Sequence, residues 1–484
     1  MKAFYIDDIT ANDLNMDDIL KGFDRSSSSV GKEYTRKALR SLLFDEDELR
    51  KRSERAGFFA ENRSEAKKLS EIFKKLGKIK KFSFYNYIFR LKEPEDKKNT
   101  VHYILIILLA LSVLSIFIYP VIGIFALIAM ICINIALYFK QRSQIEGYFL
   151  SLKYLISMIN CAGSILKKTD LKDPSFACLK EDLSSSYKNL ASLKRFSWLL
   201  TNSVSGSLID VIMDYVRMIF HVDIIRFNQM RKKALGHEDD INTLYNALGE
   251  LEFSLNISLY RQKFNVWCEP EFDKGPDICA REVYHPLIKD PVPNSIEAGG
   301  SVLFTGSNAS GKSTFLKTLA VNQIFAQTIY TCLASEYKSG LCKVLSSMAL
   351  SDNILGNESY FVVEIKSLKR IFDELGQIPV MCFIDEVLRG TNTKERIAAS
   401  TQILKKLSES NAIVFAATHD IELTKNLEGY MTNMHFSEEI NEKEVFFDYK
   451  LKEGAADSCN AIRLLSAYGF DSEMISEALK MCLP

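Results

Sequence analysis

Eight residues from Gly306 to Ser313, Gly-Ser-Asn-Ala-Ser-Gly-Lys-Ser, match the spacing G-x-x-x-x-G-K-[ST]. Glycines at both ends of such a loop allow it to curl, so that successive backbone N–H groups point inward at phosphate oxygens. Lys312 is then expected to reach the β- and γ-phosphates of a nucleotide, and the hydroxyl of Ser313 to ligate Mg²⁺. The spacing therefore predicts a site for ATP and Mg²⁺.

The residues on either side of this loop fit the same interpretation. Ser301–Thr305 is typical of a short buried strand, and Thr314–Gln327 of a following helix. A helix that begins directly after the loop adds its own N-terminal N–H groups to the anion site. We expect the following loop residues to bind the nucleotide: Gly306, Ser307, Asn308, Ala309, Ser310, Gly311, Lys312, Ser313 and Thr314.

Two carboxylates follow a second hydrophobic run, Val380–Ile384. Asp385 is predicted to hold Mg²⁺, directly or through water, and Glu386 to orient or deprotonate the attacking water. The alternative is that the acidic pair only caps a helix. His419 follows a third run, Ala412–Ala417, and we expect its imidazole to sense the γ-phosphate, although a lone histidine is more often structural.

From about residue 270 onward, short apolar runs alternate with helical patterns. Five prolines within 25 residues mark the start of this region: Pro270, Pro276, Pro286, Pro291 and Pro293. Buried strands alternating with helices predict an α/β fold with a mostly parallel sheet. In such a sheet, the ligand binds at the carboxyl ends of the strands.

A second strong signal is the apolar segment Val101–Phe139, which Tyr119-Pro120 divides into two stretches of about 19 residues. Each stretch is close to the length that a helix needs to cross a hydrocarbon core, and neither contains a charged side chain. Lysines and an arginine flank both ends, which places both flanks in the cytoplasm by the positive-inside tendency. We predict a membrane protein with two spanning helices and cytoplasmic N- and C-terminal regions; the alternative is a buried hairpin of a soluble protein.

The rest of the N-terminal half has helical patterns. Asp17–Leu43 and Asp45–Lys80 carry apolar residues at three- and four-residue spacings, and Ser26–Ser29 is interpreted as a solvated turn or helix start. Residues 143–265 again predict long helices. Their apolar residues form two stripes, one of Leu150, Tyr154, Leu155 and Met158, and one of Leu208, Val211, Ile212, Tyr215 and Met218.

Composition limits the partners less than the motifs do. Lys plus Arg and Asp plus Glu both number 61 in 484 residues, so net charge gives no support for nucleic-acid binding. The ten cysteines include no C-x-x-C pair, which favours reduced thiols over a zinc site or a disulfide framework. The first thirty residues are acidic and polar and do not resemble a signal peptide.

The order of the motifs carries a family resemblance. Thr305–Thr314, Asp385–Thr393 and Ala417–Thr424 resemble the ATPase domain of the MutS mismatch-repair family, a branch of the ABC-type ATPases. Three further stretches are similar to its signature segment, to its closing segment and, more weakly, to the opening of its helical core and lever: Ser351–Phe361, Glu453–Ala461 and Phe23–Leu49.

The resemblance implies roles for particular residues. Asn308, Lys312, Ser313, Asp385, Glu386 and His419 would contact ATP and Mg²⁺, and Ser359 would complete the partner subunit's ATP site in trans. The chain would act as a homodimer through Ile462–Cys482. Three features depart from the family pattern: Asn353 and Asn357-Glu358 in the signature, and Pro291 where an aromatic residue often stacks on adenine.

These expectations combine into one organisation. We predict an α plus α/β protein with a core/lever-like helical region at 1–98, a transmembrane hairpin at 99–140, a lever-like region at 141–268 and an ABC-type ATPase domain at 269–484. The resemblance implies an ATP-dependent DNA-binding protein of the mismatch-repair type, here anchored in a membrane and without the family's mismatch-reading domain. A membrane-tethered ATPase acting on a non-DNA partner is the alternative, and transport ranks last because two helices without charged lining make a poor pathway.

Overall fold

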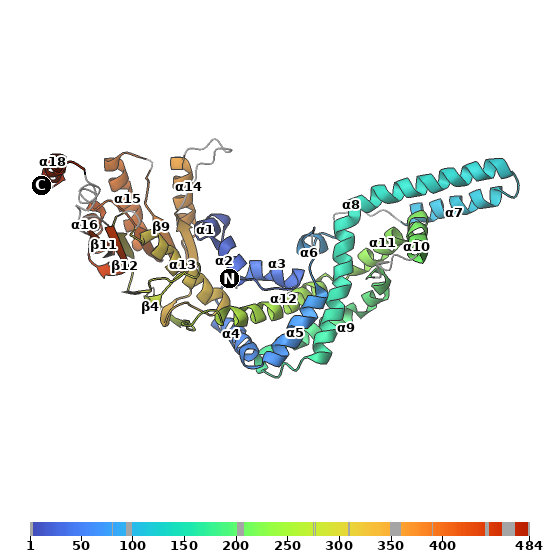
Figure 1. Cartoon of the computed structure of the whole chain (residues 1–484), viewed down its shortest axis with the longest axis horizontal. Coiled ribbons are helices and arrows are strands. Elements are labelled where there is room, and N and C mark those ends of the chain that lie inside the picture. Colours follow the sequence, from blue (N-terminus) through green and yellow to red (C-terminus); the bar gives the residue numbers. More distant parts are fainter. Residues whose placement is uncertain are drawn as a thin grey trace. The chain divides into compact units, whose positions relative to one another are not determined.

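A six-stranded sheet lies at the centre of the C-terminal half in the computed structural model of the chain (Figure 1). Its order is β12-β11-β6-β10-β9-β8, and all neighbours pair in parallel except β11 and β12. The strands are β6 (Val302–Thr305), β8 (Lys343–Ser347), β9 (Val380–Asp385), β10 (Ala412–Ala417), β11 (Thr432–Ile440) and β12 (Val445–Glu453). The predicted mostly parallel α/β sheet is thereby confirmed.

The structure describes residues 3–79, 81–92, 99–200, 208–273, 275, 277–307, 310–348, 360–389, 391–440, 445–456 and 470–482. The chain divides into two compact units. The first comprises Met1–Asp24, Arg36–Glu54 and Ile257–Pro484, and the second Arg25–Thr35 and Arg55–Asn256. Each unit is described by itself below.

In the first unit, helices pack on the central sheet because its strands are apolar on both faces. The helix α13 (Lys312–Ile329), which follows β6, packs against β9 and β10 and is buried along most of its length. Three other helices complete this region: α14 (Tyr360–Asp373), α15 (Thr393–Ser408) and α16 (Glu422–Asn426). A short helix, α18 (Ser472–Cys482), comes last in the described chain.

A second sheet of four strands, ordered β3-β7-β4-β5, belongs to the same unit. Its strands are β3 (Glu271–Asp273), β4 (Ile278–Val283), β5 (Asn294–Ala298) and β7 (Glu336–Gly340). Strand β5 leads directly toward β6, so this sheet places the segment 283–294 beside the predicted phosphate loop.

The N-terminal residues cover the edge strand β8. The side chain of Asp13, at the end of α1 (Asp8–Asp13), accepts hydrogen bonds from Ser346 Oγ at 2.6 Å and from the Met348 N–H at 3.0 Å. Thr10 Oγ1 accepts from the Ser346 N–H at 3.2 Å. An exposed edge strand invites pairing with other chains, and α1 blocks this edge by satisfying its polar groups.

The prediction of a helix through Leu43 is wrong. Helices α2 (Met16–Phe23) and α3 (Ser29–Ala38) are present, but Ser41–Leu43 forms a strand, β2, which pairs antiparallel with β1 (Ala3–Tyr5). Leu42 and Leu43 are adjacent and both buried. A short apolar run of this kind fits either a strand or a helix by periodicity alone, and here pairing with β1 decides.

The second unit is helical. Its core gathers α4 (Glu46–Glu61), α5 (Arg63–Leu76), α6 (Phe84–Ile88), α9 (Ala177–Asn189), α11 (Val222–Ala234) and α12 (Glu238–Arg261) around the later half of α8 (Pro120–Lys168). Tyr154, Leu155 and Met158 of α8 are buried in this core, as the first predicted stripe requires. The serines at the start of α3 are also buried rather than solvated, because the Glu252 carboxylate accepts from the Ser27 and Ser28 N–H groups.

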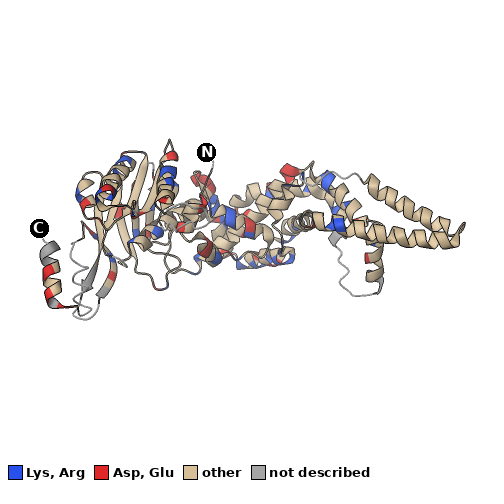
Figure 2. Cartoon of the chain, turned by 90° about the horizontal axis from the view of Figure 1, so that it is seen from above, with Lys and Arg blue, Asp and Glu red and all other residues tan. Residues whose placement is uncertain are grey.

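Helix α7 (Thr100–Ser115) and the first part of α8 form an apolar hairpin that carries no Lys, Arg, Asp or Glu (Figure 2). At its turn the helices approach closely, since a Cβ on Gly123 would lie 2.5 Å from the Ile116 nitrogen. Helix α8 differs from the predicted second span in one respect: it does not end near Phe139 but continues to Lys168. Among the described residues, α8 alone is long and apolar enough to cross a membrane, and α7 is a shorter apolar helix.

Candidate nucleotide site

The predicted phosphate loop joins β6 to the start of α13, as the sequence pattern indicated. Gly306 and Gly311 have φ values of +143° and +108°, a region that side-chain-bearing residues rarely adopt. A Cβ on Gly306 would also lie only 2.6 Å from the Phe436 carbonyl oxygen. Both glycines are therefore required by the backbone of the loop.

Lys312 is the first residue of α13, and its side chain turns back over the loop. Its Nζ donates to the carbonyl oxygens of Gly306 at 2.9 Å and Ser307 at 2.7 Å, and the residue is buried. Ser310 is also buried, and its Oγ has no hydrogen-bond partner among the described residues. A buried ammonium beside a buried unsatisfied hydroxyl suits an incoming anion with several acceptor oxygens.

Asp385 ends strand β9 and hydrogen-bonds with the Ser313 side chain. Burial raises the pKa of the Asp385 carboxyl above its usual value, and the neighbouring Glu386 carboxylate adds to this effect. A hydroxyl and a carboxylate that meet beside a phosphate loop are ligands that Mg²⁺ accepts, with phosphate oxygens and water completing the shell. The described residues contain no cluster of three His, Cys, Asp or Glu that would suit a metal held by protein alone.

Glu386 occupies a strained turn directly after β9. Its φ is +56°, and that of Leu388 is +57°, both uncommon for residues other than glycine. The turn is fixed from two sides: the Glu386 N–H donates to the Ala417 carbonyl at 2.9 Å, and the Leu388 N–H donates to the buried carboxylate of Glu364 in α14. The strain is thus located at the carboxylate that was predicted to activate water.

His419 follows β10 and meets Glu386 from the adjacent strand. Its Nε2 lies 3.0 Å from Glu386 Oε1. Burial, followed by the nearby Lys312 ammonium, lowers the pKa of His419 below its usual value, so the imidazole is neutral at physiological pH. Arg396 of α15 holds the next residue, Asp420, through two hydrogen bonds of 2.8 and 2.7 Å.

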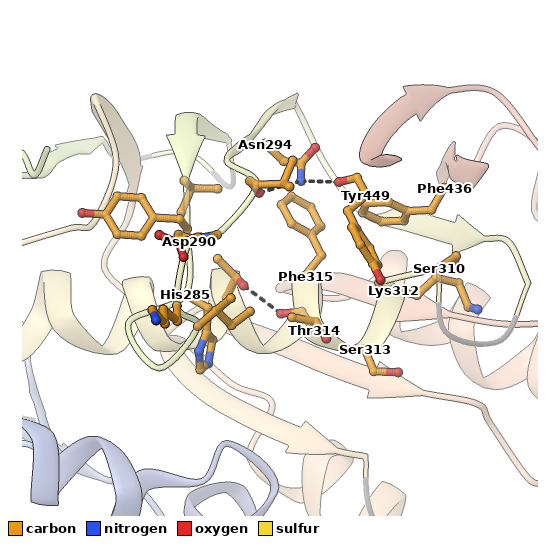
Figure 3. A pocket seen from close by; sticks show the side chains of 18 of the residues that line it. His285, Asp290, Asn294, Ser310, Lys312, Ser313, Thr314, Phe315, Phe436 and Tyr449 are labelled. Atoms are coloured by element: carbon orange, nitrogen blue, oxygen red, sulfur yellow. Dashed lines mark hydrogen bonds between the residues drawn. The ribbon is translucent and has the colours of Figure 1, made fainter. Parts of the chain in front are cut away.

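A cavity of about 590 Å³ is lined on one side by Ser310, Lys312, Ser313, Glu386 and His419 (Figure 3). The other side is formed by the segment between β4 and β5 and by two aromatic residues of β11 and β12. It includes His285, Ile288, Asp290, Pro291, Asn294, Phe436 and Tyr449. Burial lowers the pKa of His285 to about 4, so this imidazole is also neutral.

The sequence did not single out Tyr449 or Asn294. Tyr449 Cδ1 lies 3.4 Å from the place of a Cβ on Gly311, so the ring covers the loop. The Asn294 side chain fixes β12 by donating to the Tyr449 carbonyl at 2.9 Å and accepting from the Leu451 N–H at 2.8 Å (Figure 3). Neither residue belongs to a local motif, because the contact joins positions 155 residues apart.

The structure therefore brings together the predicted Gly306, Ser307, Ser310, Gly311, Lys312, Ser313, Thr314, Asp385, Glu386 and His419. Pro291 lines the same cavity, and Tyr449 supplies an aromatic ring there. Asn308, Ala309 and Ser359 lie outside the described residues. Their predicted contacts with nucleotide, and the trans role of Ser359, stay predictions.

Comparison with known proteins relates the C-terminal part of the chain to a family. The family model for MutS domain V matches residues 302–483. The DNA mismatch repair protein MutS of Leptospira interrogans (serovar copenhageni) is 26% identical over 286 residues, covering 56% of this chain and 33% of the relative. MutS of Streptococcus uberis is 27% identical over 266 residues (52% and 31%), and MutS protein homolog 4 of Mus musculus is 26% identical over 321 residues (62% and 33%).

The matched regions span about a third of the length of these relatives. The family-model match includes the strand, loop and helix that carry Lys312, together with the carboxylates at the end of β9 and the histidine after β10. Residues 302–483 of this chain are thus a MutS-type domain V, and this part relates the chain to MutS proteins.

Proposed function

We propose that this chain is a membrane-anchored, Mg²⁺-dependent ATPase of the MutS type that couples ATP binding and hydrolysis to closure of a homodimer on DNA. The observation that carries the ATPase part is the meeting of Lys312, Ser313, Asp385, Glu386 and His419 at the carboxyl ends of β6, β9 and β10. Open α/β sheets bind their ligands at this edge.

In this proposal, the loop N–H groups and Lys312 bind the β- and γ-phosphates. Ser313 and Asp385 would hold Mg²⁺, which supplies positive charge to the phosphate oxygens when bound. The base and ribose would occupy the other end of the cavity, which is lined by Tyr449, Asn294 and His285. The 590 Å³ volume is in the range of pockets that enclose a ligand of nucleotide size.

Glu386 is proposed to position the attacking water and accept its proton. Its Oε1 faces the neutral His419, and its Oε2 pairs with Arg389 Nε at 3.1 Å. These two contacts fix the direction of the carboxylate through both of its oxygens.

Membrane anchoring is proposed from the hairpin. In α7 and the first part of α8, large apolar side chains such as Ile107, Leu114, Val121 and Phe125 are at least 57% exposed. Only 17% of the most apolar 18-residue window of α8 is buried, whereas a core helix of a soluble protein is mostly buried. Exposing this surface to water is costly at about 25 cal/mol per Å². A bilayer removes this cost.

Closure around DNA is proposed from the family, whose named relatives are DNA mismatch repair proteins. The test is ATP turnover by the full chain in detergent, with and without duplex DNA, at two salt concentrations. Stimulation that falls steeply with salt supports phosphate contacts, because binding to duplex weakens as counterions compete. Turnover that is unchanged by DNA at both salt concentrations contradicts the DNA role and favours a non-DNA partner.

A further inference from the structure

Helix α10 (Leu208–Ile219) presents an apolar surface that no described residue of its unit covers. Of the apolar stripe that the sequence pattern indicated, Val211, Ile212 and Tyr215 are 49%, 61% and 54% exposed. Met213 and the following Phe220 are exposed as well. The helix contacts α8 and α11, and the residues 217–219 near its C-terminal end are half-buried.

The end of α10 is fixed to the apolar hairpin by buried polar groups. Asn134 of α8 donates from Nδ2 to the Ile219 carbonyl at 3.1 Å. His221, in the turn that follows α10, has its Nε2 2.8 Å from the Asn134 carbonyl and its Nδ1 2.8 Å from Nδ1 of His102 in α7. All three side chains are almost fully buried. The polar cluster therefore sets where α10 meets the hairpin.

The depth of this junction in a bilayer follows from the number of residues along α8. Asn134 lies 14 residues beyond Pro120, at the hairpin turn, which corresponds to about 21 Å of helix. If the turn lies at the far face of a hydrocarbon core of about 30 Å, Asn134 is about 9 Å inside the near face. Amphipathic helices that lie in a membrane interface are buried by about 5–10 Å. The junction thus places the end of α10 at interfacial depth.

Cations lie at the level expected for lipid phosphates. Lys140 and Arg142 are 20 and 22 residues beyond Pro120, or about 30–33 Å along the helix. Burial, then Arg142 and Arg217 of α10, lowers the pKa of Lys153, which shows that these three cations are neighbours. Two acids share the region, since Asp214 pairs with Arg217 at 3.3 Å and Asp223 faces Lys153. Lys140 is exposed and suits anionic headgroups, whereas the Arg142 guanidinium stacks over the Phe149 ring at 3.6 Å.

We propose that α10 is an interfacial helix, whose apolar side lies in the boundary between headgroups and acyl chains of an anionic bilayer, beside the hairpin. The proposal rests on the proposed membrane anchoring and adds a third membrane element to it. It accounts for the exposure of the α10 stripe, for the depth of its junction and for the cations at its C-terminal end. A second copy of the chain is the competing occupant.

The experiment uses tryptophan quenching in the full chain. The chain is reconstituted in vesicles of phosphatidylcholine and phosphatidylglycerol that carry bromine either near the headgroup end or near the methyl end of the acyl chains. Tyr215→Trp reports on α10 and Ile128→Trp, at a residue 54% exposed, on the hairpin. Tyr430→Trp, at a residue of similar exposure in the first unit, is the control. The two native tryptophans give the background, which is measured on the unsubstituted chain.

We expect the Tyr215→Trp signal to be quenched more by the shallow bromine. The Ile128→Trp signal should be quenched more by the deep one, because Ile128 lies eight residues, or about 12 Å, beyond Pro120 and so near the middle of the hydrocarbon core. Quenching of Ile128→Trp without quenching of Tyr215→Trp overturns the α10 proposal and leaves the anchor intact. Quenching of neither contradicts the anchor itself. A Tyr215→Trp emission shift that depends on protein concentration in detergent without vesicles overturns the proposal in favour of a second copy. Ile212→Asp in the Tyr215→Trp chain is expected to reduce shallow quenching, because a charge opposes burial in lipid.

Discussion

His419 Nε2 lies 3.0 Å from Glu386 Oε1, although the two residues follow different strands and are separated by a complete helix. The parallel pairing of β9 with β10 creates this contact, because Asp385 is in register with Ala417. The histidine is neutral, since burial and Lys312 lower its pKa. The pair therefore places a carboxylate oxygen and an imidazole nitrogen within hydrogen-bond distance at the carboxyl edge of the sheet.

Substitution of Lys312 by alanine is expected to abolish most ATP turnover. The Lys312 ammonium lies over the loop carbonyls, where phosphate would bind. Removing one group that stabilises the charge of a transition state typically lowers the rate by about 10²–10³. Lys317→Ala, on the same helix but with its Nζ on Asn15, is the matched control. Phosphate release from the purified chain is the measurement, and normal turnover in Lys312→Ala would refute the assignment of the loop.

Glu386→Ala is expected to separate binding from hydrolysis. ATP affinity stays near that of the unsubstituted chain, while turnover falls by about a hundredfold or more, because general-base catalysis is lost. In the proposed composite site, ATP then accumulates in a closed dimer. Light scattering with and without ATP tests this, with the exposed Glu409→Ala as control. A mass that never rises with ATP contradicts the composite site.

Tyr449→Ala is expected to weaken nucleotide binding roughly three- to tenfold, the effect of losing about 0.5–1.5 kcal/mol of aromatic contact. Asn294→Ala should weaken it in the same direction, because the amide fixes the backbone of Tyr449 and Leu451. Titration with a fluorescent ATP analogue gives the affinities. Tyr430→Ala removes a tyrosine that does not line the cavity and should leave binding unchanged.

Asp385→Asn is expected to stabilise the nucleotide-free chain at neutral pH while it abolishes hydrolysis. The folded-state pKa of Asp385 is raised above 3.8, mainly by burial. The fold therefore favours the protonated carboxyl. The contribution of Asp385 to the free energy of unfolding is full below pH 3.8 and is lost as the pH rises through the raised folded-state pKa, so the charged carboxylate destabilises the fold at pH 7.

Thermal unfolding with and without Mg²⁺ and ATP measures both effects of the Asp385→Asn substitution. The unsubstituted chain should gain about 2.7 kcal/mol at a ligand concentration of 100 times Kd. The substituted chain should begin with a higher midpoint and gain less. A lower midpoint without nucleotide would show that the carboxylate stabilises the fold, contrary to this interpretation.

The sequence predicted those parts of the site that are local. A strand, a glycine-bounded loop and a helix are contiguous, so Gly306–Thr314 can be identified from spacing alone, and two acids after an apolar run identify Asp385 and Glu386. Glu364, Asn294 and Tyr449 act through contacts between distant segments, and no local pattern marks them. The α10 stripe has a related lesson: periodicity identified its apolar face, but periodicity does not report what covers that face.

The length of α8 has a consequence for the protein in a bilayer. Its 49 residues form one helix of about 74 Å, which carries the second half of the apolar hairpin at one end and core residues such as Leu155 and Ile159 at the other. Apolar helices tilt when the surrounding lipid is thinner than their hydrophobic length. No loop separates the two ends of α8, although the helix bends where it leaves the hairpin (Figure 1). In the proposed membrane-anchored protein, a change of tilt would therefore reach the helical core through this one helix, and lipid thickness would be a physical variable for the helical unit.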